Sequence, residues 1–473
     1  MSEDQDQSST PATADFVVVA NRLPVDRVVG EDGEVSWRTA PGGLVTAMEP
    51  VMASRDGAWV GWHGAADGEL DPFEDAGIML VPVPLSEQEV KDYYEGFSNA
   101  TLWPLYHDSV RFPEFHREWW EAYRRVNRRF AEAVSRVANE GAVVWVQDYQ
   151  LQLVPAMLRE LRPDLRIGFF LHIPFPPVEL FVQLPWRSQL IEGLCGADVV
   201  GFQIPSDARN FIRVCRDRGG LITDEERIAL PSGRTVQARA YPISIDVDAF
   251  EALARSEAAQ AEAAEMRHNL GDPKVMILGV DRLDYTKGIT QRVRAIGELF
   301  QEGRLDPEDV VFVQVATPSR EHVEEYMKLR DEIELLVGRI NGDLGRVGRP
   351  GIVYLHSYYP RQTMAAMYQL ADLMLVTPIR DGMNLVAKEY VACRPDESGA
   401  LVLSEFAGAA YELDEAYMVN PYDINALKDT VMQALEDPPE DKAERMRALR
   451  AWLDEHDIQA WADSYLADLE DLG

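Results

Sequence analysis

The chain repeats one pattern along most of its length: a short apolar segment, a polar turn, and then a segment with helical spacing. The apolar segments form two series, at 16–19, 58–60, 79–83, 143–146, 167–171 and 199–202, and then at 274–280, 310–314, 352–355, 373–377 and 401–404. Helical segments such as 115–139 and 151–161 separate several of them. Because strands that alternate with helices favour a largely parallel sheet, the sequence predicts an α/β protein with two doubly wound domains.

The gap between the two series places the domain boundaries. At 473 residues the chain exceeds one ordinary core, and it fits two domains of roughly 200–250 residues each. We expect a disordered tail over 1–14, a first Rossmann-like domain over 15–243, a second over 244–456, and a hinge near 242–248. An Ala- and Glu-rich helix is predicted over 249–269. The last segment, 457–473, is predicted as a helix and is a candidate to cross back to the first domain.

Charge and cysteine content limit the partners and the compartment. The net charge of -34 argues against general nucleic-acid binding and against adsorption to anionic membranes. The three cysteines, Cys195, Cys215 and Cys393, form no CxxC pair, so they indicate neither a disulfide framework nor a zinc site. Residues 1–14 lack the apolar core of a signal peptide, and no apolar run reaches membrane-spanning length. We expect a cytoplasmic protein without nucleic-acid or membrane partners.

The segment RDGMNLVAKE, residues 380–389, places a charged turn between a buried strand and a helix. Backbone N–H groups at a helix N-terminus are unpaired and carry partial positive charge, so such a turn suits phosphates or sugar hydroxyls. Asp381 and Glu389 supply directional acceptors. The alternative is that Asp381 only caps the helix and Glu389 faces solvent, and this segment alone leaves both interpretations open.

The segment GVDRLDYTKG, residues 279–288, repeats the same arrangement of strand, charged turn and helix. Arg282 offers a bidentate fork and Lys287 a point charge, a combination suited to a diphosphate that departs with negative charge. A solvated surface pair is the alternative. We predict that the two strand ends converge on one ligand.

Candidate polar residues also follow strands of the first domain. Arg22 follows the first strand and Gly43 lies in a turn before a helix, which suits phosphate binding, although two glycines are more often only a tight turn. Asp148 follows the strand at 143–146, where a carboxylate can receive a hydrogen bond from an incoming hydroxyl, with helix capping as the alternative. His172 ends the next strand, but a lone His is usually structural.

The remaining motifs argue against metal and nucleophilic chemistry. Asp246-Val247-Asp248 matches the DxD of metal-dependent sugar transferases, yet its place before a helix favours a cap. HExxH, GxSxG and EF-hand patterns are absent from the sequence. We therefore expect catalysis by positioning and charge, with no metal site and no required cofactor.

Seven segments in order resemble the trehalose-6-phosphate synthase family of retaining glycosyltransferases. They are ANRLP (20–24), YYEGFSNATLWP (93–104), FFLHIPFP (169–176), GVDRLDYTKG (279–288), ATPSR (316–320), RDGMNLVAKEYVAC (380–393) and LSEFAGAA (403–410). The similarity runs from residue 16 to about residue 472. It implies the GT-B architecture, in which two Rossmann-like domains face each other across a deep cleft. It also implies transfer of glucose from a nucleotide-glucose to glucose 6-phosphate through an α,α-1,1 bond.

The resemblance also implies site residues. Those implied to be catalytic are Asp148, His172, Arg282, Lys287 and Asp381. Those implied to bind the donor are Gly43, His172, Arg282, Lys287, Asp381, Gly382, Met383, Asn384, Leu385 and Glu389. Those implied to bind the acceptor are Arg22, Tyr94, Trp103, Asp148 and Arg320. Arg282 and Lys287 would clamp the diphosphate, and Asp381 would bind the glucose hydroxyls.

Members of this family are thought to work by front-face attack, with the leaving diphosphate taking the acceptor proton. Some relatives have His on both sides of the Asp-Tyr pair, where this chain has Gln147 and Gln150. Two rival functions are a pseudo-glycosyltransferase that couples a nucleotide-activated cyclitol to an aminocyclitol phosphate, and a catalytically silent sugar-phosphate sensor. The sequence does not decide whether the donor nucleotide is UDP, GDP or ADP. The oligomeric state also stays open, and a homo-oligomer is one of the options. A separate phosphatase is expected to act on the product.

Overall fold

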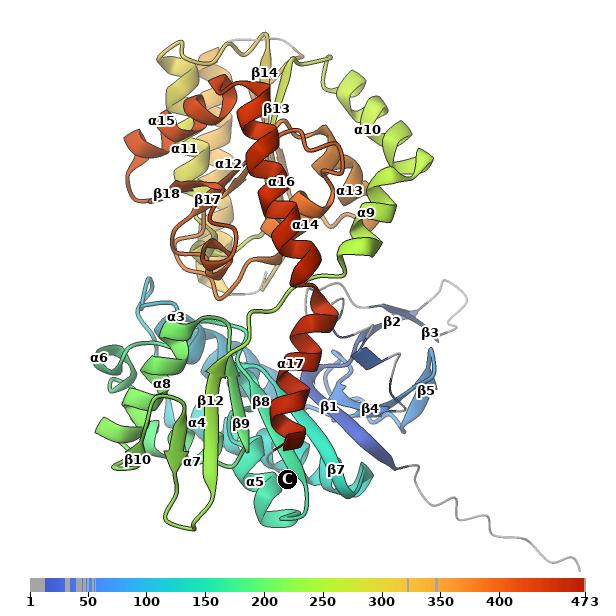
Figure 1. Cartoon of the computed structure of the whole chain (residues 1–473), viewed down its shortest axis with the longest axis vertical. Helices are drawn as coiled ribbons and strands as arrows, with labels where there is room; N and C mark the ends of the chain where they lie inside the picture. Colours follow the sequence, from blue (N-terminus) through green and yellow to red (C-terminus); the bar gives the residue numbers. More distant parts are fainter. Residues whose placement is uncertain are drawn as a thin grey trace, which may run out of the picture. The chain divides into compact units, whose positions relative to one another are not determined.

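The computed structural model describes residues 13–29, 35–39, 45, 48, 51–52, 55, 57–320, 323–344 and 348–471. Most of the expected tail and Gly43 lie outside these residues, and the first strand already begins at Ala14. Contacts along the chain group into two compact units (Figure 1). Unit 1 comprises Met1–Ala240 with Ser464–Gly473, and unit 2 comprises Tyr241–Asp463.

Unit 1 is built on a ten-stranded sheet with the order β10-β11-β12-β9-β8-β7-β1-β4-β6-β5. The strands from β12 to β6 in this order are parallel, whereas β5, β10 and β11 pair in antiparallel fashion at the edges. Their bounds are β1 (Ala14–Arg22), β4 (Gly57–Trp62), β5 (Phe73–Asp75), β6 (Ile78–Pro82), β7 (Ala138–Gln147), β8 (Arg166–Phe170), β9 (Val199–Phe202), β10 (Ile222–Thr223), β11 (Arg227–Ala229) and β12 (Thr235–Ala240). A separate hairpin joins β2 (Val25–Val29) to β3 (Val35–Thr39).

The helical elements of unit 1 include one that the sequence pattern did not predict. The 13 residues of η1 (Val90–Leu102) form a π-helix, a rare form that occurs frequently at functional sites. The other elements are α2 (Glu87–Glu89), α3 (Trp103–Tyr106), α4 (Arg117–Val137), η2 (Tyr149–Leu151), α5 (Val154–Leu161), α6 (Val178–Phe181), α7 (Arg187–Leu194) and α8 (Pro205–Asp217).

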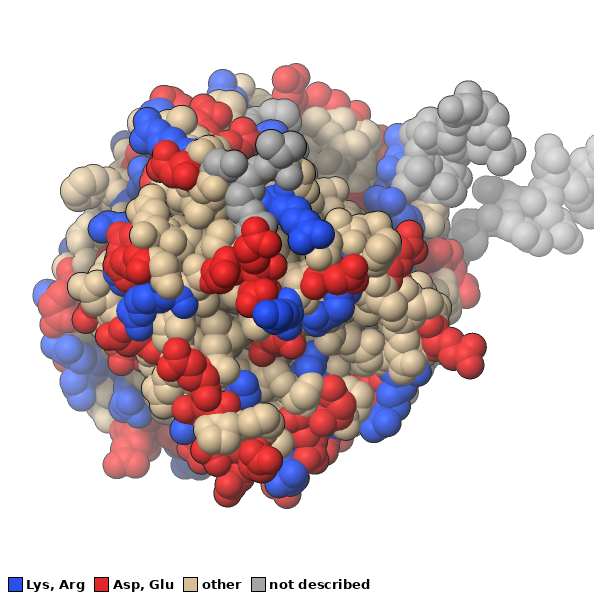
Figure 2. Space-filling model, turned by 90° about the horizontal axis from the view of Figure 1, so that it is seen from above, with Lys and Arg blue, Asp and Glu red and all other residues tan. Residues whose placement is uncertain are grey.

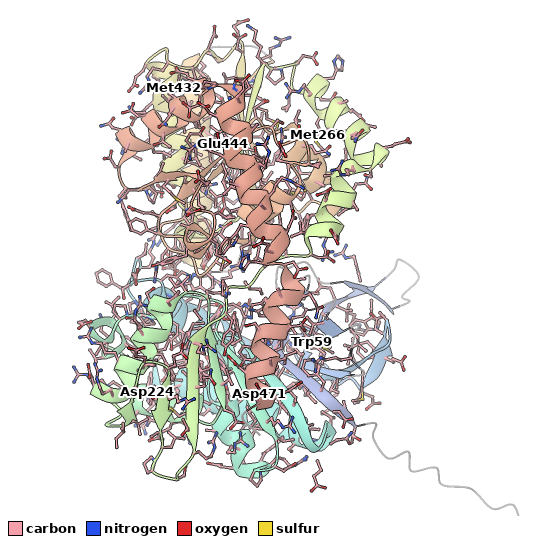
Figure 3. All side chains as sticks on the ribbon, viewed as in Figure 1. Trp59, Asp224, Met266, Met432, Glu444 and Asp471 are labelled. Carbon is pink, nitrogen blue, oxygen red and sulfur yellow. The ribbon has the colours of Figure 1, made fainter. Side chains whose placement is uncertain are left out.

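The core of unit 1 contains buried aromatic side chains whose polar groups are hydrogen bonded. Trp59 on β4, labelled in Figure 3, is 1% exposed and donates its indole N–H to the Arg22 carbonyl at 2.9 Å. Tyr465, on the end of α17 (Ile458–Asp471) that belongs to unit 1, stacks on Trp145 with ring centroids 4.6 Å apart. The end of the chain is thus part of the hydrophobic core of unit 1.

Unit 2 has a six-stranded sheet in which every pairing is parallel, with the order β15-β14-β13-β16-β17-β18. The strands are β13 (Val275–Arg282), β14 (Val310–Thr317), β15 (Ile352–Leu355), β16 (Leu373–Val376), β17 (Ala400–Ser404) and β18 (Tyr417–Val419). The central strands are fully buried, which explains why they are near-continuous apolar runs in the sequence.

Helices cover both faces of the unit 2 sheet. On one face lie α11 (Ile289–Gln301), α12 (Glu324–Leu344) and α15 (Ile424–Glu436) (Figure 1). On the other face lie α9 (Val247–Arg255), α10 (Glu257–Asn269), α13 (Arg361–Leu370), α14 (Leu385–Ala392) and α16 (Pro439–Glu455). Unit 2 also contains two short 3-10 helices, η3 (Tyr285–Lys287) and η4 (Gly408–Tyr411). The single helix predicted over 249–269 is wrong, because Ser256 adopts an extended backbone and its side chain caps the new helix α10 at the Ala259 N–H.

The predicted fold class is confirmed: the chain is α/β, and each unit is a doubly wound, Rossmann-like layer structure. No helix of the described residues is both long and apolar enough to cross a lipid bilayer. On the face shown in Figure 2, acidic and basic side chains are interspersed, and the basic ones form no continuous area. The cysteines Cys195, Cys215 and Cys393 are all buried and free.

Candidate active site

The carboxyl ends of two neighbouring strands bring together the charged residues of unit 2. Strands β13 and β16 pair directly, and Lys287 and Asp381 lie in the turns that follow them. The Lys287 Nζ is 2.6 Å from Asp381 Oδ2, and both side chains are nearly buried. The Asn384 side-chain amide donates to the same carboxylate oxygen at 3.0 Å. The two strand ends therefore meet, as the sequence pattern predicts.

Backbone packing fixes these two turns against each other. The Ile379 N–H donates to the Thr286 carbonyl at 2.7 Å. Gly288 has φ +64°, and a Cβ atom there would lie 2.1 Å from the Thr377 carbonyl oxygen. Only glycine tolerates both this left-handed backbone and this close approach without strain.

A third segment, from the LSEFAGAA motif, supports the turn that carries Asp381. The Ala409 N–H donates to the Met383 carbonyl at 2.8 Å. A Cβ atom on Gly408 would lie 1.8 Å from the Gly382 carbonyl oxygen, so this glycine is required by packing. The motif thus has a structural task that the sequence alone did not reveal.

The helix α14 begins beside this turn, and its cap decides between the two interpretations of the segment. Asn384, with φ +84°, caps the helix by accepting a hydrogen bond from the Ala387 N–H. Asp381 instead pairs with Lys287, and Glu389 accepts a 2.7 Å hydrogen bond from the Tyr368 hydroxyl. Burial raises the pKa of Glu389. The interpretation in which Asp381 caps the helix and Glu389 faces solvent is wrong.

A buried carboxylate lies beside the predicted arginines of unit 2. Asp284 Oδ2 accepts hydrogen bonds from Arg320 at 3.1 Å and from the Tyr326 hydroxyl at 2.9 Å. Burial pushes the pKa of Asp284 upward, but the charges of Arg320 and Arg282 outweigh it and the pKa lies below its ordinary value. Arg282 itself is exposed at the end of β13.

In unit 1, Asp148 and His172 lie together at the ends of β7 and β8. The Asp148 backbone has φ +73° and ψ 171°, a region that residues other than glycine rarely adopt. Its Oδ1 accepts the His172 N–H at 3.1 Å, and its own N–H donates to the Phe170 carbonyl at 2.8 Å. Its side chain makes no capping hydrogen bond to η2, so the capping alternative is wrong.

The imidazole of His172 is held in a neutral form. Its Nε2 is 2.9 Å from the Gln147 Oε1. Although the side chain retains some exposure, the protein packed around it removes water and lowers the pKa to about 3. At neutral pH the ring therefore acts through hydrogen bonds and not as a cation.

Arg22 lies in an aromatic setting at the end of β1. Its guanidinium is 5.0 Å from the Trp62 ring centroid, and Trp62 is 6.0 Å from the Tyr94 ring. Its NH2 contacts Asp26 Oδ1 at 2.8 Å, while 42% of the side chain remains exposed. A Cβ atom on Gly64 would lie 2.2 Å from this NH2, so the glycine makes room for it.

Trp103 lies a short distance along the chain, at the junction of η1 and α3. Its ring is buried, 5.6 Å from Tyr149 and 4.2 Å from the His107 ring. The Tyr149 hydroxyl donates to Asn99 on the π-helix at 2.7 Å. Tyr149 thus ties this part of η1 to the turn that carries Asp148.

The structure groups the predicted residues into several clusters. Arg22 and Tyr94 lie around Trp62, Asp148 contacts His172, and Lys287 contacts Asp381. Arg320 belongs to unit 2, so the predicted acceptor set is divided between the units.

Sequence reasoning missed other members of these networks. Asp284 lies inside the segment GVDRLDYTKG, so its charge in a turn after a strand could have marked it as a site residue. Tyr326 and Tyr368 lie in no motif, and no local sequence pattern marks them. Asp246 caps α9 through the Ala249 N–H, as its position suggested. In the described part of the chain, no group of three or more His, Cys, Asp or Glu is arranged to hold a metal ion.

Comparisons with known proteins agree on one family. The model of glycosyltransferase family 20 matches residues 14–471. A trehalose-6-phosphate synthase of Mycobacterium sp. (strain KMS) is 55% identical and covers 100% of this chain and 98% of its own. One of Mycolicibacterium gilvum (strain PYR-GCK) is 56% identical, covering 96% of this chain and 93% of its own.

Solved structures give the same result. An α,α-trehalose-phosphate synthase (UDP-forming) from Burkholderia vietnamiensis has a TM-score of 0.89 at 35% identity and covers 97% of both chains. One from Burkholderia xenovorans in complex with glucose-6-phosphate has the same TM-score and identity, covering 96% of this chain and 99% of its own. The match confirms the GT-B fold class. This chain belongs to glycosyltransferase family 20.

Proposed function

We propose that this chain transfers glucose from UDP-glucose to glucose 6-phosphate with retention of configuration, forming α,α-trehalose 6-phosphate. The contact between Lys287 and Asp381, where β13 and β16 end beside the N-terminus of α14, is the observation that carries this proposal. An ammonium has three donors, and the pair with Asp381 uses one of them. The others suit diphosphate oxygens, while the carboxylate suits the glucose hydroxyls.

The remaining donor contacts follow from the same strand ends. Arg282, exposed at the end of β13, supplies a bidentate fork for the diphosphate. The backbone from Gly382 to Leu385 presents N–H groups at the start of α14. We propose that Glu389 on that helix binds the ribose. We assign His172, neutral and fixed by Gln147, to the glucose 6-hydroxyl. The proposed contact from Gly43 lies outside the described residues.

The acceptor is a sugar phosphate, which requires cationic and hydrogen-bonding groups for a dianion. Arg22, packed on Trp62 with part of its guanidinium exposed, suits this task, and we propose Tyr94, Trp103 and Arg320 as its companions. Asp148 is proposed to receive a hydrogen bond from the acceptor sugar.

The chemistry needs no enzyme nucleophile. The acceptor hydroxyl attacks the anomeric carbon on the face from which the diphosphate departs, and the diphosphate oxygen that leaves takes the acceptor proton. Configuration is therefore retained. The protein contributes alignment of two substrates and stabilisation of the leaving negative charge by Arg282, Lys287 and the helix N-terminus.

The solved relatives support the choice of substrates. One is named as UDP-forming, one as a complex with glucose-6-phosphate, and one, from E. coli, as bound with UDP-2-fluoro glucose at 33% identity. These names support uracil as the base of the donor nucleotide and glucose 6-phosphate as the acceptor. They do not favour cyclitol coupling or a silent sensor.

A donor and acceptor matrix tests the proposal. Release of nucleoside diphosphate is measured with UDP-, GDP- and ADP-glucose, each with and without glucose 6-phosphate. We expect release only with the acceptor and fastest with UDP-glucose. Equal release without the acceptor indicates a hydrolase, and binding of glucose 6-phosphate with no release from any donor indicates a sensor or a cyclitol-coupling enzyme.

Several further features remain proposals. We propose that no metal or other cofactor is required, that the protein acts in the cytoplasm, and that a separate phosphatase converts the product to free trehalose. Assembly into a homo-oligomer is also proposed. Activity after treatment with EDTA and sedimentation velocity test the first and last of these directly.

A further inference from the structure

A buried arginine outside the predicted site contacts the strand before Lys287, the turn that carries Lys287, and the neighbouring strand β16. Arg292 lies on α11 and is 0% exposed. Its NH2 donates to the Lys287 carbonyl at 2.5 Å, and its NH1 donates to the Leu375 carbonyl on β16 at 2.9 Å. The same NH1 is 2.7 Å from Asp281 Oδ2 on β13. One guanidinium therefore joins β13, the turn after β13, and β16.

The surroundings of Arg292 are adapted to this arrangement. A Cβ atom on Gly279 would lie 2.9 Å from its NH1 and 2.5 Å from the Gln314 Oε1, so the glycine leaves room for the guanidinium. Asp281 is itself buried, and burial raises its pKa to about 6 against the opposing charges of Arg292 and Lys287. A buried ion pair contributes little net stability compared with a well-packed apolar pair. Stability alone is therefore a weak reason for placing one here.

We infer that Arg292 is a positioning residue for the transfer reaction, which holds Lys287 in the place where the leaving diphosphate needs it. This inference rests on the proposed role of Lys287 at the diphosphate. The guanidinium fixes the Lys287 backbone through its carbonyl, and Asp281 supplies the compensating charge. Arg292 touches no substrate in this account. It acts through Lys287, whose ammonium also contacts Asp381.

Arginine is specifically suited to this position. Its planar fork reaches two carbonyls and a carboxylate at once, whereas a lysine carries a single ammonium on a flexible stem. Arg292→Lys therefore keeps the charge for Asp281 but loses part of the fixed geometry. Because a displacement of about 1 Å can cost on the order of 100-fold in rate, we expect kcat to fall about 10- to 100-fold, with a smaller change in the KM for UDP-glucose.

A matched control separates this effect from general destabilisation. Arg394, also in unit 2 and 5% exposed, donates to the carbonyls of Tyr368, Gln369 and Ala371. Among the described residues, it contacts none of those proposed to bind substrate, and it reaches Tyr368, the hydrogen-bond partner of Glu389, through the Tyr368 carbonyl. Arg394→Lys is expected to lower the melting temperature by an amount comparable to Arg292→Lys while changing kcat less than twofold.

The test is a kinetic double-mutant cycle between Arg292→Lys and Lys287→Met, with melting temperatures measured in parallel. If Arg292 acts through Lys287, kcat of the double variant matches that of Lys287→Met within about twofold, because the two residues act as one unit. Two outcomes overturn the inference: losses in kcat that multiply in the double variant, or a loss of kcat in Arg394→Lys as large as that in Arg292→Lys. If Arg292→Lys does not fold, Asp281→Asn with Arg292→Met removes the buried charges together and enters the same cycle.

The wild-type enzyme separates this inference from the proposed function. Wild-type turnover of UDP-glucose with glucose 6-phosphate, combined with multiplicative losses in the cycle, refutes only the role of Arg292. No wild-type turnover with any donor refutes the proposed function itself.

Discussion

At the scale of single residues, the site stores strain at Asp148. Its backbone lies in a region used almost only by glycine, and such a conformation costs about 1–3 kcal/mol. The residue nevertheless keeps a side chain, which accepts the His172 N–H. A glycine would relieve the strain but would remove the carboxylate, so the strained backbone is consistent with a task for the side chain.

Asp148→Gly is therefore expected to separate stability from activity. Relief of strain offsets loss of one hydrogen bond of about 1 kcal/mol, so the free energy of unfolding stays equal or rises. Asp148→Ala keeps the strain and loses the bond, so it should be less stable by about 1–2 kcal/mol. Both variants should lose most of their kcat/KM. Urea unfolding and steady-state kinetics measure the two quantities, and equal stability of the Gly and Ala variants contradicts the account.

The neutral state of His172 predicts a pH dependence of stability. Its pKa is about 3 in the folded chain, below the ordinary 6.5, so the unfolded chain binds the extra proton between these values. The stability contributed by the neutral ring is complete above pH 6.5 and is lost as the pH falls toward 3. Melting curves from pH 7 to pH 4 should show a smaller acid loss for His172→Gln than for wild type. If the melting temperatures of the two proteins fall equally with pH, protonation of His172 does not destabilise the folded chain.

The residues with strong local signals could be predicted from the sequence, and those defined by packing could not. Lys287 and Asp381 follow apolar runs in charged turns, and the structure places them in contact. Arg292 and Tyr326 lie in ordinary helical patterns, so nothing local marks them as partners of the site. Their roles depend on which strands are neighbours, and that information is three-dimensional.

At the scale of elements, the donor side of unit 2 depends on how closely two turns approach. The turn after β13 packs on the end of β16 through Gly288, whose missing Cβ leaves room for the Thr377 carbonyl. Gly303, two residues after the end of α11, has nearly the same backbone (φ +69° against +64°), but no atom of the described residues lies within 4 Å of its Cβ position. The two glycines form a matched pair in which only crowding differs.

Alanine at each glycine separates backbone strain from crowding. Gly303→Ala should cost about 1 kcal/mol of unfolding free energy, because only the left-handed backbone is strained. Gly288→Ala should cost at least twice as much and should also weaken UDP binding, because the two turns must move apart. Chemical denaturation and calorimetric titration with UDP give both numbers. If the two variants bind UDP with equal affinity, the turn contact does not position the donor residues.

The elements that sequence patterns describe well are those with simple periodicity. The strand ranges expected in both series agree closely with the observed strands, because buried parallel strands are continuous apolar runs. The break at Ser256 and the π-helix η1 were missed. A cap in the middle of an Ala- and Glu-rich segment and an altered hydrogen-bonding register leave no change in hydrophobic spacing to detect.

At the scale of the whole molecule, the chain enters unit 1 a second time through the end of α17. Tyr465 donates to the carbonyls of Phe169 and Val199 at 3.0 and 3.1 Å. Cβ atoms on Gly168 and Gly201 would lie 2.5 and 2.7 Å from Tyr465 atoms, so two strands lack side chains where this ring packs. Unit 1 is therefore completed by the last residues of the chain.

Tyr465→Ala should destabilise unit 1 selectively. Loss of a buried aromatic ring costs about 3–5 kcal/mol, and the glycines beneath it cannot refill the space. Tyr465→Phe keeps the ring and should cost about 1 kcal/mol through the lost hydroxyl. Scanning calorimetry with and without UDP measures the change, and UDP binding to unit 2 should persist in both variants. Loss of UDP binding in Tyr465→Phe would contradict the expectation that Tyr465 stabilises unit 1 alone.

The bond that the enzyme forms can be identified from the product of UDP-glucose labelled with ¹³C at the anomeric carbon. After reaction with unlabelled glucose 6-phosphate, we expect a non-reducing disaccharide phosphate whose labelled carbon gives an α-anomeric signal coupled across the oxygen to a second α-anomeric centre. A β-anomeric signal would contradict retention, and labelled free glucose would contradict transfer to the sugar phosphate.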